Sequence, residues 1–96
     1  MILIVDDDIA VRTSLALLLE SSGNRVLTAE NAEDALSIIG QEAPKLIILD
    51  LNFSIDTSGK EGMELLRHIR LVNAGVPVIL ITGWASIDLA VQGMKL

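Results

Sequence analysis

The sequence contains no cysteine, few basic residues and no long hydrophobic run. Without cysteine the chain has no disulfide, no thiolate chemistry and no zinc–thiolate site, which fits a reducing compartment. Seven Lys and Arg against 13 Asp and Glu give a net charge of −6, which argues against nucleic acid or an anionic membrane as a direct partner. No apolar run approaches the roughly 18 residues that a membrane span needs, and Met1 precedes an apolar segment without a basic signal-peptide start. We therefore expect a cytoplasmic protein.

The 96 residues, 51% of them hydrophobic, are enough for one domain with one core. Short apolar segments alternate with segments of helical periodicity along the whole chain. The apolar segments are 2–6, 25–29, 45–50 and 78–81, and the helical segments are about 9–22, 32–40, 61–72 and 85–96. Strands that alternate with helices predict an α/β fold with a parallel sheet and right-handed crossovers.

Spacing within each segment predicts which side chains are buried. The strands at 2–5, 46–49 and 78–81 are apolar without alternation, so we expect them to be buried on both faces of the sheet. Helical spacing predicts these inward-facing residues: Val11, Leu15, Leu18 and Leu19 in the first helix, Ala32, Ala35, Leu36 and Ile39 in the second, and Leu65, Leu66, Ile69 and Val72 in the third. Asp8 and Asn31 are expected to cap the first two helices, and Gly23 to end the first.

Acidic residues follow two of the predicted strands. Asp6 and Asp7 come directly after the first strand, and Asp50 ends the third. The carboxyl ends of parallel strands meet at one edge of the sheet, where open α/β folds bind ligands. Two carboxylates about 4 Å apart repel by roughly 4 kcal/mol at an effective dielectric near 20, so a convergent cluster requires a shared proton or a bound cation. Mg²⁺, which prefers oxygen ligands and keeps several waters, suits such a site.

Asp50 is the candidate nucleophile, because a carboxylate can accept a phosphoryl group and hold it as an acyl phosphate. Phosphoryl transfer otherwise needs positioning and cations that neutralise the phosphoryl oxygens. We expect Asp7 and Asp50 to bind Mg²⁺ directly, Asp6 to bind it through water, and the main-chain carbonyl of Asn52 to be a further ligand. The hydroxyl of Thr82, which follows the fourth strand, can donate to a phosphoryl oxygen.

Three segments, in this order, resemble the CheY-like receiver domain of bacterial response regulators. They read Ile-Leu-Ile-Val-Asp-Asp-Asp (2–8), Leu-Ile-Ile-Leu-Asp-Leu-Asn (46–52) and Val-Ile-Leu-Ile-Thr-Gly-Trp (78–84). The resemblance implies a flavodoxin-like, doubly wound parallel sheet in three α/β/α layers, with strand order 2-1-3-4-5. It also implies that a histidine kinase phosphorylates Asp50 and that Thr82 reorients towards the phosphate, which shifts the surface around the fourth helix.

Two further segments are similar to receivers of NtrC-type, sigma-54-dependent transcription activators. These are the long loop after Asp50 and the segment 82–96. In that branch the receiver controls an ATPase domain and a DNA-binding domain, neither of which is in this sequence. The family also has a fifth strand that ends on a lysine, and a fifth helix. None of Lys45, Lys60 and Lys95 occupies the place of that lysine, so we interpret residues 1–96 as a receiver domain that is partial at its C-terminus.

Without the fifth strand and helix, the fourth strand would leave an open edge, which predicts a homodimer, an exchanged oligomer or a marginally stable monomer. Two other functions compete with the signalling phosphoacceptor, which would at most catalyse its own phosphorylation and dephosphorylation. A haloacid-dehalogenase-like phosphatase would need a second acid in an Asp-x-Asp pattern, but Asn52 stands there. A phosphorylation-independent pseudo-receiver would be a pure interaction domain. The intact Asp6, Asp7, Asp50 and Thr82 argue against it, whereas a receiver that is partial at its C-terminus argues for it.

Overall fold

The computed structural model describes residues 1–50 and 60–81. In these residues four strands and three helices alternate as the sequence predicts. They are β1 (Ile2–Val5), α1 (Ile9–Ser21), β2 (Val26–Ala29), α2 (Ala32–Gln41), β3 (Leu46–Asp50), α3 (Lys60–Val72) and β4 (Val78–Ile81). All strand pairs are parallel, and the order is β2-β1-β3-β4. The α/β class and the flavodoxin-like order are therefore confirmed, whereas the predicted helix 85–96 and the loop 51–59 lie outside the described residues.

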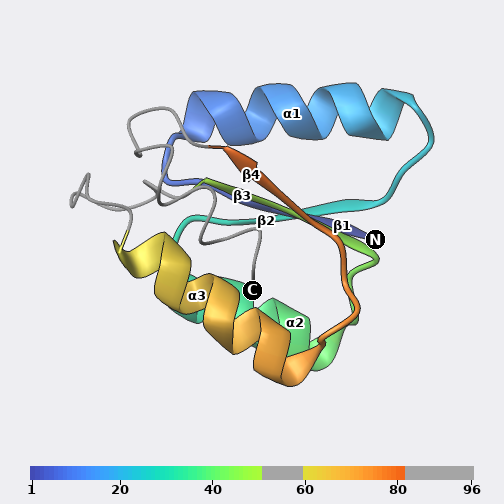
Figure 1. The fold of residues 1–96 in the computed structure, drawn as a ribbon. Coiled ribbons are helices and arrows are strands. Elements are labelled where there is room, and N and C mark those ends of the chain that lie inside the picture. The colour runs from blue at the N-terminus through green and yellow to red at the C-terminus, as the bar shows by residue number, and fades with distance from the viewer. Residues whose placement is uncertain (51–59, 82–96) are drawn as a thin grey trace.

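The sheet is the middle of three layers. Helix α1 lies along one face, and α2 and α3 lie along the other (Figure 1). Successive side chains of a strand point to opposite faces, so Leu3 and Val5 of β1 pack towards α2 and α3 while Ile2 and Ile4 pack towards α1. All four side chains are buried, which confirms that β1 is covered on both faces. The central strand is thereby fixed in position, and its carboxyl end with it.

Helix α1 packs on β1 and β2 through a narrow stripe of residues. Leu15, Ala16 and Leu19 contact the apolar cluster on that face of the sheet. The prediction that Leu18 faces inward is wrong, because its side chain is 63% exposed. Leu18 precedes Leu19 by one residue and therefore lies about 100° away from it around the helix, on the side that the sheet does not reach.

Two other burial predictions, in α3 and β4, are wrong. Val72 is 62% exposed because it is the last residue of α3, where the chain leaves the helix for the turn to β4. Ile79 is 52% exposed, so β4 is not buried on both faces. Within the described residues β4 lies at the edge of the sheet, and α1 packs over β1 and β2 rather than over β4.

The predicted caps are confirmed where the structure describes them. A carboxylate oxygen of Asp8 accepts the N–H of Ala10 (2.8 Å), and the side-chain oxygen of Asn31 accepts the N–H of Asp34 (2.8 Å). Gly23 follows α1 with φ +89°, a conformation that favours glycine. None of the described helices is long and apolar enough to cross a membrane.

Candidate metal centre

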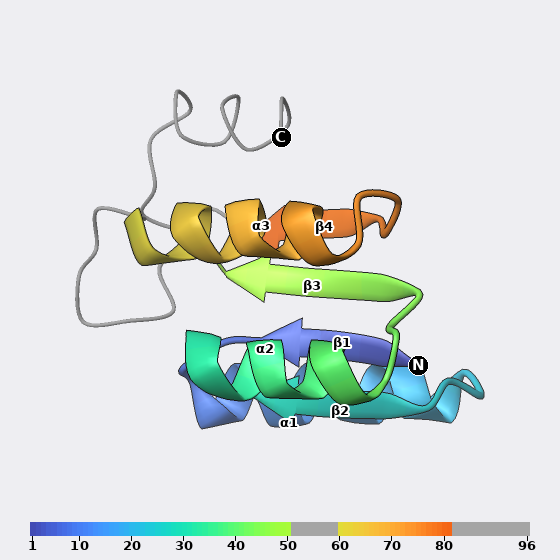
Figure 2. The ribbon, with the colours of Figure 1, turned by 90° about the horizontal axis from the view of Figure 1, so that it is seen from below.

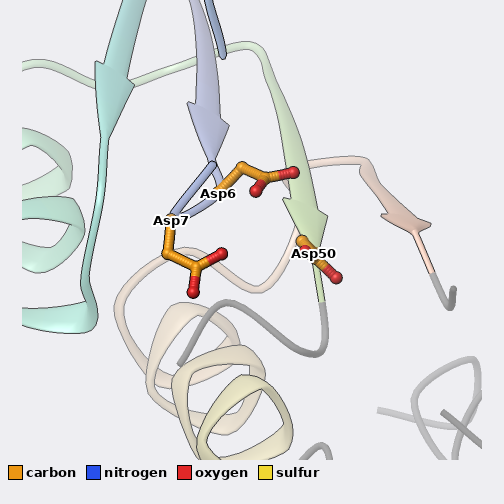
Figure 3. Close-up of side chains that lie close together, drawn as sticks. All are labelled: Asp6, Asp7 and Asp50. Carbon is orange, nitrogen blue, oxygen red and sulfur yellow. The ribbon is translucent and has the colours of Figure 1, made fainter. Parts of the chain in front are cut away.

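The acidic residues converge because the two central strands end level with each other. Strands β1 and β3 are neighbours, and Val5 pairs with Leu49, so the residues that follow, Asp6 and Asp50, are placed side by side. One carboxylate oxygen from each of Asp6, Asp7 and Asp50 lies within 4.8 Å of the others. Figure 3 shows Asp6 and Asp7 extending from the end of β1 and Asp50 from the end of β3. The predicted convergence at the carboxyl edge of the sheet is confirmed.

The turn from β1 to α1 holds Asp6 in place through several hydrogen bonds. The N–H of Asp6 donates to the carbonyl of Ala29 (3.1 Å), which continues the ladder between β1 and β2. A carboxylate oxygen of Asp6 accepts the N–H of Asp8 (2.9 Å). The main-chain oxygen of Asp6 accepts a hydrogen bond from the guanidinium of Arg12 (2.7 Å). Both the main chain and the side chain of Asp6 are therefore held by hydrogen bonds within the protein itself.

Charge and burial act together on Asp6. Its side chain is only 3% exposed, and this burial is the main cause that raises the pKa of Asp6 above the ordinary value for aspartate. The hydrogen bond from the N–H of Asp8 opposes the rise, and the negative charges of Asp50, Asp7 and Asp8 add to it. A raised pKa means that the ionised cluster is unfavourable by itself, so a cation that neutralises it would be stabilised there.

The chemistry of the ligands suits a hard divalent cation. Three carboxylates supply oxygen donors, and they range from buried Asp6 through half-buried Asp50 to exposed Asp7. A cluster that is open on one side leaves room for water and for a substrate oxygen, as Mg²⁺ sites commonly do. The residues present therefore fit the predicted Mg²⁺ site.

The structure places some of the predicted site residues and not others. Asp6, Asp7 and Asp50 are brought together as predicted. The main-chain carbonyl of Asn52 and the hydroxyl of Thr82 lie outside the described residues, so their roles stay predictions. The end of β4 is described up to Ile81, which pairs with Asp50 at the same edge of the sheet.

Arg12 is the contact that sequence reasoning missed. Its side chain reaches from the first turns of α1 to the main-chain oxygen of Asp6, six residues earlier. Its position on the helix indicates that it lies near the end of β1. The sequence alone does not show that the oxygen of Asp6 needs a donor, because that depends on where β2 ends.

Comparison with known proteins identifies relatives over nearly the whole chain. The family model for the response regulator receiver domain matches residues 2–96. The transcriptional regulatory protein ZraR of Klebsiella oxytoca is 35% identical over 94 residues, which are 98% of this chain and 20% of ZraR. The chain thus spans about a fifth of the length of that relative.

Solved structures of receivers share the fold. The crystal structure of a response regulator protein from Burkholderia pseudomallei, with a phosphorylated aspartic acid, a calcium ion and citrate, is 32% identical. It matches with a TM-score of 0.87 over 98% of this chain and 53% of that one. The solution structure of the beryllofluoride-activated NtrC4 receiver domain dimer is 30% identical, with a TM-score of 0.86 over 98% of this chain and 74% of that one.

Proposed function

Because this chain belongs to the response regulator receiver domain family, we propose that it accepts a phosphoryl group from a histidine kinase on Asp50. Receiver domains are signalling phosphoacceptors. The observation that carries the proposal is the cluster of Asp6, Asp7 and Asp50, whose carboxylate oxygens lie within 4.8 Å at the carboxyl edge of the sheet. The family match supports this function over a haloacid-dehalogenase-like phosphatase, and no observation favours a pseudo-receiver.

Mg²⁺ is the proposed cofactor, with Asp7 and Asp50 as direct ligands and Asp6 acting through water. Asp6 suits binding through water because it is buried and its carboxylate already accepts the N–H of Asp8. When bound, the cation would offset the repulsion among the carboxylates and neutralise the oxygens of the incoming phosphoryl group. The main-chain carbonyl of Asn52, two residues past the nucleophile, is proposed as a further ligand.

Asp50 is proposed to act as the nucleophile from a rigid support. The three residues before it, Ile47, Ile48 and Leu49, are buried in β3, so the strand fixes the direction from which the carboxylate reacts. An oxygen of Asp50 would form a bond to phosphorus while the bond from phosphorus to the histidine nitrogen of the kinase breaks. That nitrogen keeps the electron pair. Thr82 is proposed to donate its hydroxyl to the phosphoryl oxygen afterwards.

The proposed partners are a sensor histidine kinase and an output domain that regulates transcription, as in NtrC-type regulators. The similarity to ZraR and to the NtrC4 receiver supports that branch of the family. The beryllofluoride-activated NtrC4 receiver domain is a dimer, so we also propose a homodimer for the phosphorylated chain. These contacts would take place in the cytoplasm.

Incubation with phosphoramidate and Mg²⁺, followed by intact-mass measurement, tests the acceptor. We expect the wild-type protein to gain one phosphoryl group that hydroxylamine removes, because acyl phosphates react with it. Asp50→Asn should gain none. Asp8→Asn is the matched control: it also neutralises one acid near the carboxyl edge of the sheet, but an asparagine at the N-cap of α1 still accepts the N–H of Ala10, so phosphorylation should persist.

Two results would contradict the proposal. Phosphate found on Ser, Thr or His, with Asp50 unmodified, would refute the acceptor role. A wild-type protein that stays unmodified with phosphoramidate and also fails to bind beryllofluoride, whose atoms stand in for the phosphoryl group, would instead indicate a pseudo-receiver.

A further inference from the structure

The main chain at the end of β1 depends on a donor from outside the sheet. Asp6 makes the last hydrogen bond of the β1–β2 ladder, from its N–H to the carbonyl of Ala29. In a parallel pair the carbonyl of Asp6 would accept from a residue further along β2, but β2 ends at Ala29 and the chain goes on to α2. The guanidinium of Arg12 supplies that donor instead, at 2.7 Å.

Arg12 closes a turn that already contains three short-range hydrogen bonds. The N–H of Asp8 donates to the carboxylate of Asp6, the N–H of Ala10 donates to the carboxylate of Asp8, and the N–H of Arg12 donates to the carbonyl of Asp8. Asp6 and Asp8 are thus held on both sides of Asp7. The direction in which Asp7 leaves the strand is set by its two neighbours rather than by its own side chain.

The contact of Arg12 is with a main-chain oxygen and not with a carboxylate. Its side chain is half-buried beside the turn, where a hydrogen bond from a charged donor is worth more than a neutral one. A positive charge near the cluster would by itself repel a divalent cation. A favourable effect of Arg12 on cation binding can therefore come only from the geometry that it imposes.

We infer that Arg12 is a positioning residue for the carboxylate cluster: it holds the main-chain oxygen of Asp6, just after β1, and so directs Asp7 towards Asp50. The inference rests on the proposed cation site and adds a residue that does not touch the cation. Groups that orient metal ligands in this way commonly change metal affinity by 10- to 100-fold when they are removed.

Titration of the whole chain with Mn²⁺ as the probe, by calorimetry, tests the inference. We expect Arg12→Met to bind Mn²⁺ about tenfold more weakly than wild type, although the removed positive charge alone would strengthen binding. Arg12→Lys keeps a charged donor on a long side chain and should recover most of the affinity.

Arg70→Met is the matched control. Arg70 also donates from α3 to main-chain oxygens, those of Ala74 and Val76, but it does so at the turn before β4, at the opposite edge of the sheet. Arg70→Met therefore removes one positive charge and hydrogen bonds from a guanidinium to the main chain, as Arg12→Met does. We expect both variants to lower the Tm, because each loses a hydrogen bond to the main chain. Arg70→Met should leave Mn²⁺ affinity within about twofold of wild type, because the site is remote.

A second measurement does not need the cation. Amide hydrogen exchange at Asp8, whose N–H bonds the carboxylate of Asp6, should become faster in Arg12→Met and stay unchanged in Arg70→Met. If Arg12→Met does not fold, Arg12→Gln, whose side chain is two atoms shorter, takes its place with the same expectations.

The outcomes separate the two proposals. Equal or tighter Mn²⁺ binding by Arg12→Met, with wild type binding normally, would overturn the role of Arg12 and leave the cation site standing. A wild-type protein that binds no Mn²⁺ or Mg²⁺ would overturn the cation site itself, and the role of Arg12 with it. An equal loss of affinity in Arg70→Met would show a general effect of stability, which also overturns the inference.

Discussion

The strands of the parallel sheet share one direction, so the sheet has a carboxyl edge and an amino edge (Figure 2), and the two edges differ in how their charged residues are arranged. At the carboxyl edge three carboxylates lie together, and the pKa of Asp6 is raised, first by burial and then by the neighbouring acids. At the amino edge two opposite charges are paired: Arg25, just before β2, bonds Glu42, just beyond the end of α2 (2.5 Å). The same sheet therefore has like charges close together at one edge and an ion pair of opposite charges at the other.

The ion pair at the amino edge contributes to the fold, whereas the carboxylate cluster at the carboxyl edge is arranged for a ligand. At the amino edge Arg25 and Glu42 offset each other's charge, whereas at the carboxyl edge burial and the neighbouring acids raise the pKa of Asp6, so a bound cation would be stabilised there. A protein that keeps like charges together at the expense of stability is prepared for a ligand of the opposite charge. Substitutions at the two edges should therefore differ in sign as well as in size.

The largest expected effect is on cation binding when an acid at the carboxyl edge is neutralised. Asp7→Asn should weaken Mg²⁺ or Mn²⁺ binding more than about tenfold, because it removes a unit of charge and the proposed direct ligand from the cluster. Glu42→Gln neutralises an acid at the amino edge and should leave binding unchanged. Calorimetric titration of both variants measures the contrast, and equal losses in both would show that the protein responds only to net charge.

An effect of intermediate size is expected when Asp6 is neutralised, on the stability of the protein without a bound cation. Its raised folded-state pKa means that its contribution to stability is fully present below the ordinary aspartate pKa and is lost as the pH rises through the raised value. Metal-free wild type should therefore gain stability from Asp6 on acidification from roughly pH 7 towards pH 4. Asp6→Asn, whose amide oxygen still accepts the N–H of Asp8, should be more stable at neutral pH, by about 3–6 °C in Tm.

Thermal melts of wild type and Asp6→Asn, at neutral and mildly acidic pH and with and without Mg²⁺, check this expectation. The difference between the two proteins should shrink as the pH falls, and Mg²⁺ should raise the Tm of wild type more than that of Asp6→Asn. A variant that is less stable than wild type at neutral pH would mean that the carboxylate contributes favourable bonds that outweigh its burial and its neighbours.

The carboxyl edge could be predicted from the sequence because each step is local. Uninterrupted apolar runs mark strands covered on both sides, and an acid at the end of such a run lies at the sheet edge. Asp6, Asp7 and Asp50 meet once β1 and β3 are neighbours, and the order that the family resemblance implies makes them so. The caps formed by Asp8 and Asn31 could be predicted for the same reason, since each depends on the next few residues alone.

The features that sequence reasoning missed depend on how elements meet. Periodicity shows which residues share a helix face, but the covered width of that face depends on the neighbouring element, so periodicity predicts that Leu18 faces inward although it is exposed. Ile79 is exposed because burial of a strand depends on what lies over it, and α1 packs on other strands. The bond from Arg12 to Asp6 requires knowing that β2 ends at Ala29, which is a tertiary boundary.

The smallest expected effect is at the amino edge, in the ion pair of Arg25 and Glu42. Both side chains are largely open to water, with 64% and 39% of their surfaces exposed, so solvent screens their attraction and ordering two long side chains offsets much of it. Arg25→Met, Glu42→Gln and the double variant should each shift the Tm by about 2 °C or less. Added salt should reduce even that shift, because exposed pairs are screened. A double-mutant cycle from thermal melts measures the coupling. A coupling between Arg25 and Glu42 as large as the effect of Asp6→Asn would mean that electrostatics affect stability equally at both edges. The contrast between the two edges would then be wrong.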